Sequence, residues 1–115
     1  MAAAQLRCSV NKIKIDIPEQ YKDYINSGGR TEGGLSIDPG WFQLWAIDEI
    51  DGLNFEYHVS EYAPGYLGFG SSGGGEMLAF DYEGRISMIP FIGMSPDEAI
   101  VIADSWKDFE NTIEK

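Results

Sequence analysis

The stretch GFGSSGGGEMLAFDYEGRISMIPFI, residues 68–92, decides between two classes of fold. Five glycines occupy its first eight positions, and an apolar segment begins at Met77. A glycine-rich loop that holds phosphate is followed by a helix, whose N-terminal dipole attracts the anion. The segment after these glycines lacks helical spacing and is typical of a strand. The letters G-x-G-x-x-G are present, but no Walker lysine follows, and Glu76 places a negative charge where a phosphate would bind. We therefore interpret the glycines as a bend and not as a nucleotide site.

Two apolar runs joined by YEGR predict a β-hairpin over residues 76–92, with its turn around Gly84. Glycine allows a positive φ or a close approach of two backbones, which suits a tight bend that feeds a strand. We therefore expect a structural role for the bend before the hairpin, which consists of Gly73, Gly74, Gly75 and Glu76.

The two ends of the domain predict helices. PEQYKDYINSGG, residues 18–29, reads as a short amphipathic helix, because proline is favoured in a first helical turn and Gly28 is a stop signal. Near the C-terminus, Ser105 and Asp108 resemble a capping box that begins a helix with Trp106 on its apolar face.

The segments between these helices predict mainly strands. The signals are an alternation of polar and apolar residues, aromatic runs, and clusters of turn formers. They predict a strand over residues 12–17, a loop over 28–40, a strand over 41–47, a helix over 47–59 that Asp48 begins or caps, and short strands over 66–70 and 99–102.

This order of elements predicts a single α+β domain with a mainly antiparallel central sheet, on one face of which the two terminal helices pack. We expect residues 1–17 to form an N-terminal segment that could supply an edge strand, and residues 18–115 to form the domain itself. A doubly wound parallel sheet is excluded, because strands and helices do not alternate regularly along the chain.

The composition supports a folded protein inside the cell. Hydrophobic residues make up 43% of the 115 residues and aromatic residues 13%, which is ordinary for a packed domain. The single cysteine, Cys8, cannot form an internal disulfide, and no apolar run approaches the length of a membrane span. We expect a cytoplasmic protein that does not bind membranes.

The charge of the chain restricts its partners. Eight Lys and Arg against 19 Asp and Glu give a net charge of -11. A field of this sign repels nucleic acids and anionic lipids and attracts basic proteins. It also keeps an acidic protein in solution, which is the simpler explanation.

No cluster of residues predicts catalysis, a cofactor or a metal. His58 is the only histidine and has no cysteine at ligand spacing, so we interpret it as a surface residue. Ser71 and Ser72 have no base nearby in the sequence and lack the G-x-S-x-G motif of hydrolases. We expect that the protein is not an enzyme.

Four segments together resemble the SMI1/KNR4 family, also called the SUKH superfamily. They are DIPEQYKDYINSGG, WFQLWAIDEI, YLGFGSSGGGEMLAFD with the hairpin after it, and IADSWKDFENTI, which span roughly residues 16–115 in the family's order. Members commonly carry a helix before the P-x-x-Y segment, whereas only 17 residues precede Pro18 here. The matching positions are Pro18, Tyr21, Lys22, Gly28, Gly29, Gly73, Gly74, Gly75, Glu76, Asp81, Ser105, Trp106 and Phe109.

The resemblance implies an α+β domain that acts by binding protein. Bacterial members are largely immunity proteins, each of which neutralises a cognate polymorphic toxin that is often a nuclease, and fungal relatives act in cell-wall regulation through protein contacts. We expect a bacterial immunity protein that binds a basic toxin. The alternatives are a regulatory interaction domain without a toxin partner, and a small-molecule or enzymatic domain that uses loop 68–76 and the acids.

The candidate binding residues combine acids with tyrosines. Carboxylates could pair with arginines and lysines of a basic toxin, although such a run is usually a solvated helix face. Tyrosine is a frequent interface anchor, whereas we assign Trp41, Trp45 and Trp106 mainly to the core. The candidates are Asp48, Glu49, Asp51, Glu56, Glu61, Tyr62 and Tyr66.

Overall fold

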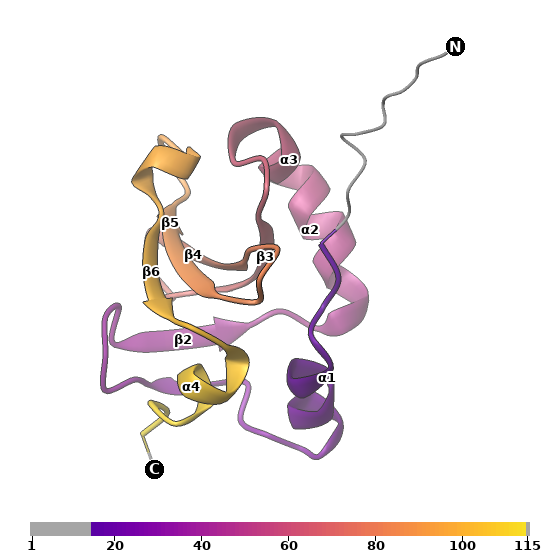
Figure 1. The fold of residues 1–115 in the computed structure, drawn as a ribbon, viewed down its shortest axis with the longest axis vertical. Coiled ribbons are helices and arrows are strands. Elements are labelled where there is room, and N and C mark those ends of the chain that lie inside the picture. The colour runs from indigo at the N-terminus through magenta and orange to yellow at the C-terminus, as the bar shows by residue number, and fades with distance from the viewer. Residues whose placement is uncertain (1–14, 115) are drawn as a thin grey trace.

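The computed structural model describes residues 15–114, which form a six-stranded antiparallel sheet (Figure 1). The strands lie in the order β1-β2-β3-β4-β5-β6, so each strand pairs with its neighbours in sequence. The predicted strands at 41–47, 66–70 and 99–102 are confirmed. The strands are β1 (Glu32–Gly34), β2 (Trp41–Leu44), β3 (Leu67–Ser71), β4 (Glu76–Phe80), β5 (Ile86–Pro90) and β6 (Ile100–Ala103).

Four helices of the described residues accompany the sheet, and with it they confirm the α+β class. Helices α1 and α4 lie together at the lower end of Figure 1, and α2 and α3 follow one another along its right side. The helices are α1 (Glu19–Asn26), α2 (Ile50–Glu56), α3 (Val59–Tyr62) and α4 (Trp106–Glu110), with 3₁₀ turns η3 (Ile47–Glu49) and η4 (Pro96–Glu98).

The two terminal helices begin and end as the sequence predicts. Pro18 lies at the N-cap position of α1 with φ −59°, and Gly28 follows the helix in the left-handed region at φ +85°. The Ser105 hydroxyl accepts a hydrogen bond from the N–H of Asp108 at 3.1 Å, which caps α4.

The predicted hairpin is present as β4 and β5, and one carboxylate organises its turn. The Asp81 side chain accepts hydrogen bonds from the backbone N–H groups of Glu83 at 2.9 Å and Arg85 at 3.0 Å, and from the Arg85 guanidinium at 2.9 Å. The hydrogen bond to Asp81 is the main cause of a raised pKa at Arg85. Gly84 completes the turn at φ +80°.

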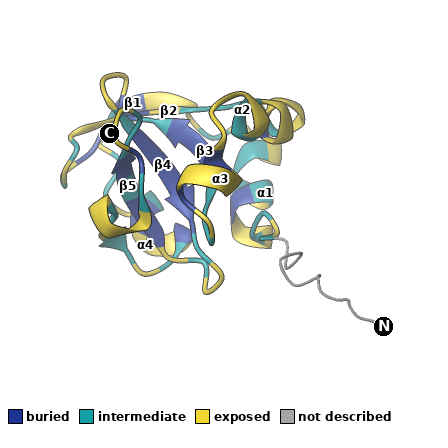
Figure 2. Ribbon diagram, turned by 90° about the horizontal axis from the view of Figure 1, so that it is seen from above, coloured by how far each residue is buried: buried dark blue, intermediate teal, exposed yellow. Residues whose placement is uncertain are grey.

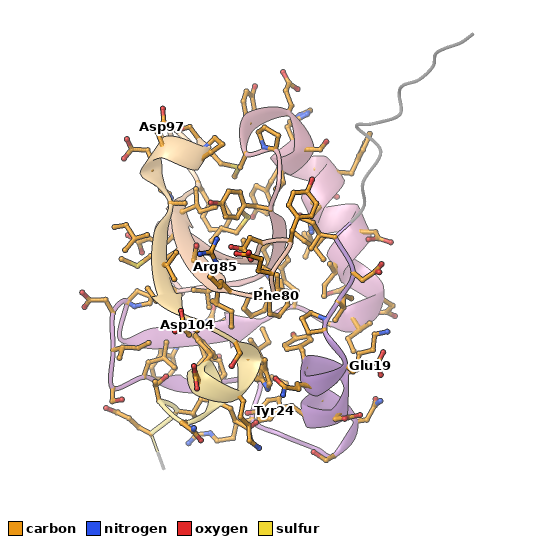
Figure 3. The ribbon with its side chains drawn as sticks, in the orientation of Figure 1. Glu19, Tyr24, Phe80, Arg85, Asp97 and Asp104 are labelled. Carbon is orange, nitrogen blue, oxygen red and sulfur yellow. The ribbon has the colours of Figure 1, made fainter. Side chains whose placement is uncertain are left out.

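The two terminal helices pack on one face of the sheet, as predicted, and the short helix α3 packs on the other face, which the sequence did not predict. Because side chains alternate along a strand, neighbouring residues of β4 point to opposite faces. Phe80 points to the main face, which α1 and α4 cover through Tyr21 and Trp106. Ala79 points to the opposite face, where Val59 of α3 packs. Figure 2 shows the buried strands at the centre, and Figure 3 shows Phe80 in the interior.

Three local predictions differ from the structure in the part of the chain that it describes. The loop over 28–40 contains β1, because Gly33 and Gly34 form backbone pairs with β2 that need no side chains. Of the strand predicted over 12–17, only residues 15–17 are described, and they form no strand; Ile15 and Ile17 instead pack against the main core. Asp48 does not cap a helix, since it lies inside η3.

The predicted helix over 47–59 is divided. It contains η3 and α2 and then breaks at His58, which has the left-handed φ of 58°, before α3 begins. Of the tryptophans, Trp106 is buried as predicted and Trp45 is half-buried, but Trp41 is 43% exposed and does not belong to the core.

Candidate protein-binding surface

The acidic segment, residues 47–62, carries five carboxylates and no lysine or arginine. Each of the five side chains is exposed. Of these five carboxylates, only that of Glu61 lies close to a basic group among residues 15–114, namely the His58 imidazole at 3.7 Å. The segment therefore presents four carboxylates, at Asp48, Glu49, Asp51 and Glu56, that form no ion pair with any described residue.

Asn54 fixes this segment to the sheet. Its side-chain amide donates hydrogen bonds to the carbonyls of Ile50 at 2.7 Å and Gly68 at 2.8 Å, and its oxygen accepts from the Gly68 N–H at 2.8 Å. Ile50 and Val59 are buried, which anchors both α2 and α3. The acids therefore lie on helices that are attached to the sheet by buried side chains and by the hydrogen bonds of Asn54.

Phe55 is a functional candidate that the sequence interpretation missed. Its side chain is 81% exposed on the same short helix as Asp51 and Glu56. The helical spacing of Ile50 and Leu53 could have found it, because Phe55 falls on the face opposite to those apolar residues. An exposed aromatic among carboxylates gives a surface that can bury apolar area as well as bind cations.

The two candidate tyrosines lie in different environments. Tyr62 is exposed at the end of α3, with its ring edge-on to His58 at a centroid distance of 6.0 Å. Tyr66 is half-buried against the opposite-face core and lines an open hollow of about 360 Å³ with Tyr82 and Arg85. The structure therefore groups Tyr62, and not Tyr66, with the acidic segment.

The glycines of the bend, residues 73–75, join β3 to β4, and Glu76 is the first residue of β4. These three residues are called the glycine bend below. Two of its three backbone N–H groups donate to serines: the Ser71 hydroxyl accepts from Gly73 at 3.1 Å, and the Ser72 hydroxyl accepts from Gly74 at 3.1 Å. Ser72 also donates to the Glu76 carboxylate at 2.8 Å. A strand follows the bend, and Gly73 has φ +80°. This geometry offers an anion neither a helix dipole nor a full set of free amides.

The described hollows do not form a pocket at the glycine bend. One of about 440 Å³ lies around Tyr24 and Arg30, where α1 meets α4. A second of about 440 Å³ lies between Lys22 and Asp51. Partial burial raises the pKa of Tyr24, and full burial raises that of Tyr21 further, but both rings belong to the main core.

The described residues contain no group of three or more His, Cys, Asp or Glu side chains that could hold a metal ion. A search of the same part of the chain finds no helix long and apolar enough to cross a membrane. The groups that this surface presents for binding are carboxylates, aromatic rings and exposed backbone.

Comparison with known proteins identifies a family to which the sequence is similar. A sequence profile described as the SMI1 / KNR4 family (SUKH-1) matches residues 3–112, which is nearly the whole chain. No curated protein matches the sequence.

Proposed function

The chain belongs to the SMI1/KNR4 family (SUKH-1), and from this membership we propose that it is an immunity protein that neutralises a basic toxin domain by direct binding. Membership of the family supports an immunity-protein-like or protein-interaction role. The toxin partner, and the acidic segment as the surface that meets it, are our proposal.

One observation supports the proposal most strongly: the acidic segment concentrates carboxylates that form no ion pair with a described lysine or arginine. Acids also lie elsewhere, such as Glu19 on α1 and Asp97 on η4 at opposite ends of the molecule (Figure 3), so total charge does not select a surface. Glu19 is paired with Lys22 at 3.2 Å, whereas Asp97 forms no ion pair with a described residue. The acidic segment is distinguished by five carboxylates in a stretch without lysine or arginine. A run of unpaired acids attracts a basic partner over several ångströms and accelerates its association.

The contact itself would combine electrostatic and apolar contributions. Exposed ion pairs at the rim of an interface are each worth about 1 kcal/mol or less, so charge alone gives rate and selectivity more than affinity. Phe55 supplies the apolar part, because a buried aromatic is a common centre of binding energy. A nuclease that acts on anionic nucleic acid has a basic active-site surface, which an acidic inhibitor of this kind would cover.

The experiment is affinity capture by the tagged protein from a lysate of its source cells at low and high salt, with captured proteins identified by mass spectrometry. The test variant carries Asp48→Asn, Glu49→Gln and Asp51→Asn. The matched control carries Asp23→Asn, Asp38→Asn and Glu98→Gln, which removes the same charge from exposed positions outside the segment.

We expect salt-sensitive capture of one basic protein that the test variant loses and the control variant retains. Expression of that protein alone should then arrest growth, and co-expression of this chain should relieve the arrest. Capture of a basic partner that is not toxic would favour the regulatory interaction domain instead. Equal capture by test and control variants would refute the role of the acidic segment.

A further inference from the structure

An aromatic strip lies on the opposite face of the sheet and is partly open to solvent. It consists of Trp41, Trp45, Tyr57 and Phe91, and the exposed Ile92 follows Phe91 in the sequence. The rings of Trp45 and Tyr57 are stacked at a centroid distance of 5.9 Å, and those of Tyr57 and Phe91 lie 4.7 Å apart. Trp41 is 43% exposed, Tyr57 42% and Ile92 93%, so the strip is not a closed core.

The glycine bend connects the two ends of this strip. A Cβ atom placed on Gly73 would lie 3.0 Å from Cδ1 of Trp41, so the indole rests directly against the bare backbone. At the other end, the carbonyl of Gly75 accepts a hydrogen bond from the N–H of Phe91 at 2.9 Å. Gly75 itself has open space where a side chain would be. The missing side chains leave this stretch of backbone and the flanking rings accessible.

Strand alternation explains why the strip is open. Along β2, Phe42 points into the main core, so Trp41 and Gln43 point to the opposite face. Helix α3 packs on that face over the centre of the sheet, through Val59 and Ala63. Trp41 and Gln43 remain exposed, and β2 therefore presents its opposite face to solvent.

An unpaired carboxylate lies beside the Trp41 end of the strip. Glu32 of β1 is the Cα partner of Gln43, and the Gln43 amide donates to the Glu32 carboxylate at 3.4 Å, which places Glu32 on the same face as Trp41. A second exposed carboxylate, that of Glu56, directly precedes Tyr57 in the sequence, at the end of α2. Neither carboxylate forms an ion pair with a described residue.

We propose that the aromatic strip and the glycine bend form the docking surface for arginine side chains of the basic protein partner. This inference rests on the proposed function, since it specifies how a basic partner is recognised. A planar guanidinium stacks on an indole or phenol ring while its N–H groups reach neighbouring carboxylates, a combination that lysine matches less well. A second copy of this chain does not fit, because it would place acids of one sign against each other.

The test uses a blocked arginine-rich peptide and a lysine peptide of equal length as probes. Binding is measured by titration at low salt, and the indole N–H signals of the three tryptophans are followed by NMR, with buried Trp106 as internal reference. The variants are Trp41→Ser and Gly75→Arg; the second adds a bulky cation at a position with open space, where the fold tolerates it. Tyr82→Ser is the matched control, because Tyr82 is 58% exposed on the hairpin turn, outside the strip.

We expect the arginine peptide to bind more tightly than the lysine peptide and to shift the Trp41 signal but not that of Trp106. Trp41→Ser should weaken arginine binding about two- to fivefold, as loss of one exposed cation–π contact predicts. Gly75→Arg should weaken it as well, and Tyr82→Ser should not.

The two proposals fail in different ways. If neutralising Asp48, Glu49 and Asp51 weakens peptide binding but Trp41→Ser and Gly75→Arg do not, the acidic segment stands and the aromatic strip is refuted. If Trp41→Ser weakens binding while neutralisation has no effect, the strip stands and the acidic segment is refuted. Saturated binding without movement of the Trp41 signal would overturn this inference, and absence of binding at low salt would overturn both.

Discussion

Replacement of Gly70 by alanine tests whether a glycine of the stretch 68–75 is needed for the fold. Gly70 lies in β3, in one of the two Cα pairs that join β3 to β2. An added Cβ would lie 2.5 Å from the Gln43 carbonyl oxygen and 3.3 Å from Cα of Leu44. Both atoms are backbone and cannot rotate away, so the strands must separate.

The expected cost of Gly70→Ala is about 2–3 kcal/mol of unfolding free energy. Overpacking costs about 1–3 kcal/mol, and a weakened ladder hydrogen bond adds about 1 kcal/mol. The lower entropy of the unfolded alanine chain offsets about 0.4–1 kcal/mol of this. Since domains of this size are stable by about 5–15 kcal/mol, the variant should still fold.

Urea unfolding followed by tryptophan fluorescence measures this cost, and Gly75→Ala is the matched control. An added Cβ at Gly75 meets no atom within 4 Å, and its φ lies outside the left-handed region. Gly75→Ala should therefore leave stability unchanged or raise it by up to about 1 kcal/mol. If Gly70→Ala were as stable as Gly75→Ala, the close approach of β2 and β3 would not explain the glycine.

Three further changes test other parts of the structure by the same unfolding measurement. Asn54→Ala should cost about 2–3 kcal/mol, because it leaves both backbone groups of Gly68 without their partner; a cost near zero would show that water replaces the amide. Ser105→Ala should cost about 1 kcal/mol through loss of the cap on Asp108, and an unchanged midpoint would contradict this. Tyr21→Phe should gain about 1 kcal/mol at neutral pH, because the buried hydroxyl has no hydrogen-bond partner among the described residues. Burial also raises the pKa of Tyr21 in the folded state, so above pH 10 the unfolded chain loses a proton that the folded chain keeps. The wild type should therefore lose stability above pH 10 more steeply than Tyr21→Phe, and parallel curves would refute that reasoning.

The two proposed binding surfaces make different demands on the fold. The acidic segment depends on Asn54 and on the buried residues of α2 and α3 to hold its carboxylates in place. The aromatic strip depends on the glycine bend, which keeps side chains away from Trp41. Asn54→Ala should thus affect capture through the acids more than stacking on Trp41, which allows the two surfaces to be separated in one set of variants.

The sequence alone determined the elements whose signals are local. Pro18 and Gly28 delimit α1, Ser105 begins α4, and the turn residues around Gly84 define the hairpin. These signals act through the backbone conformations that one residue or one turn can adopt, and they need no distant partner. The combination of such segments was also sufficient to indicate the family.

Only the tertiary structure decided which surfaces remain open. Strand β1 exists because β2 pairs with it, and two glycines give no side-chain pattern from which to predict that pairing. The sequence placed Trp41 in the core as an aromatic of a strand, but its face of β2 has no helix above it. Asn54 appeared as an ordinary polar residue until the fold brought Gly68 beside it. Exposure and long-range hydrogen bonds depend on which elements pack together, and local propensity does not contain that information.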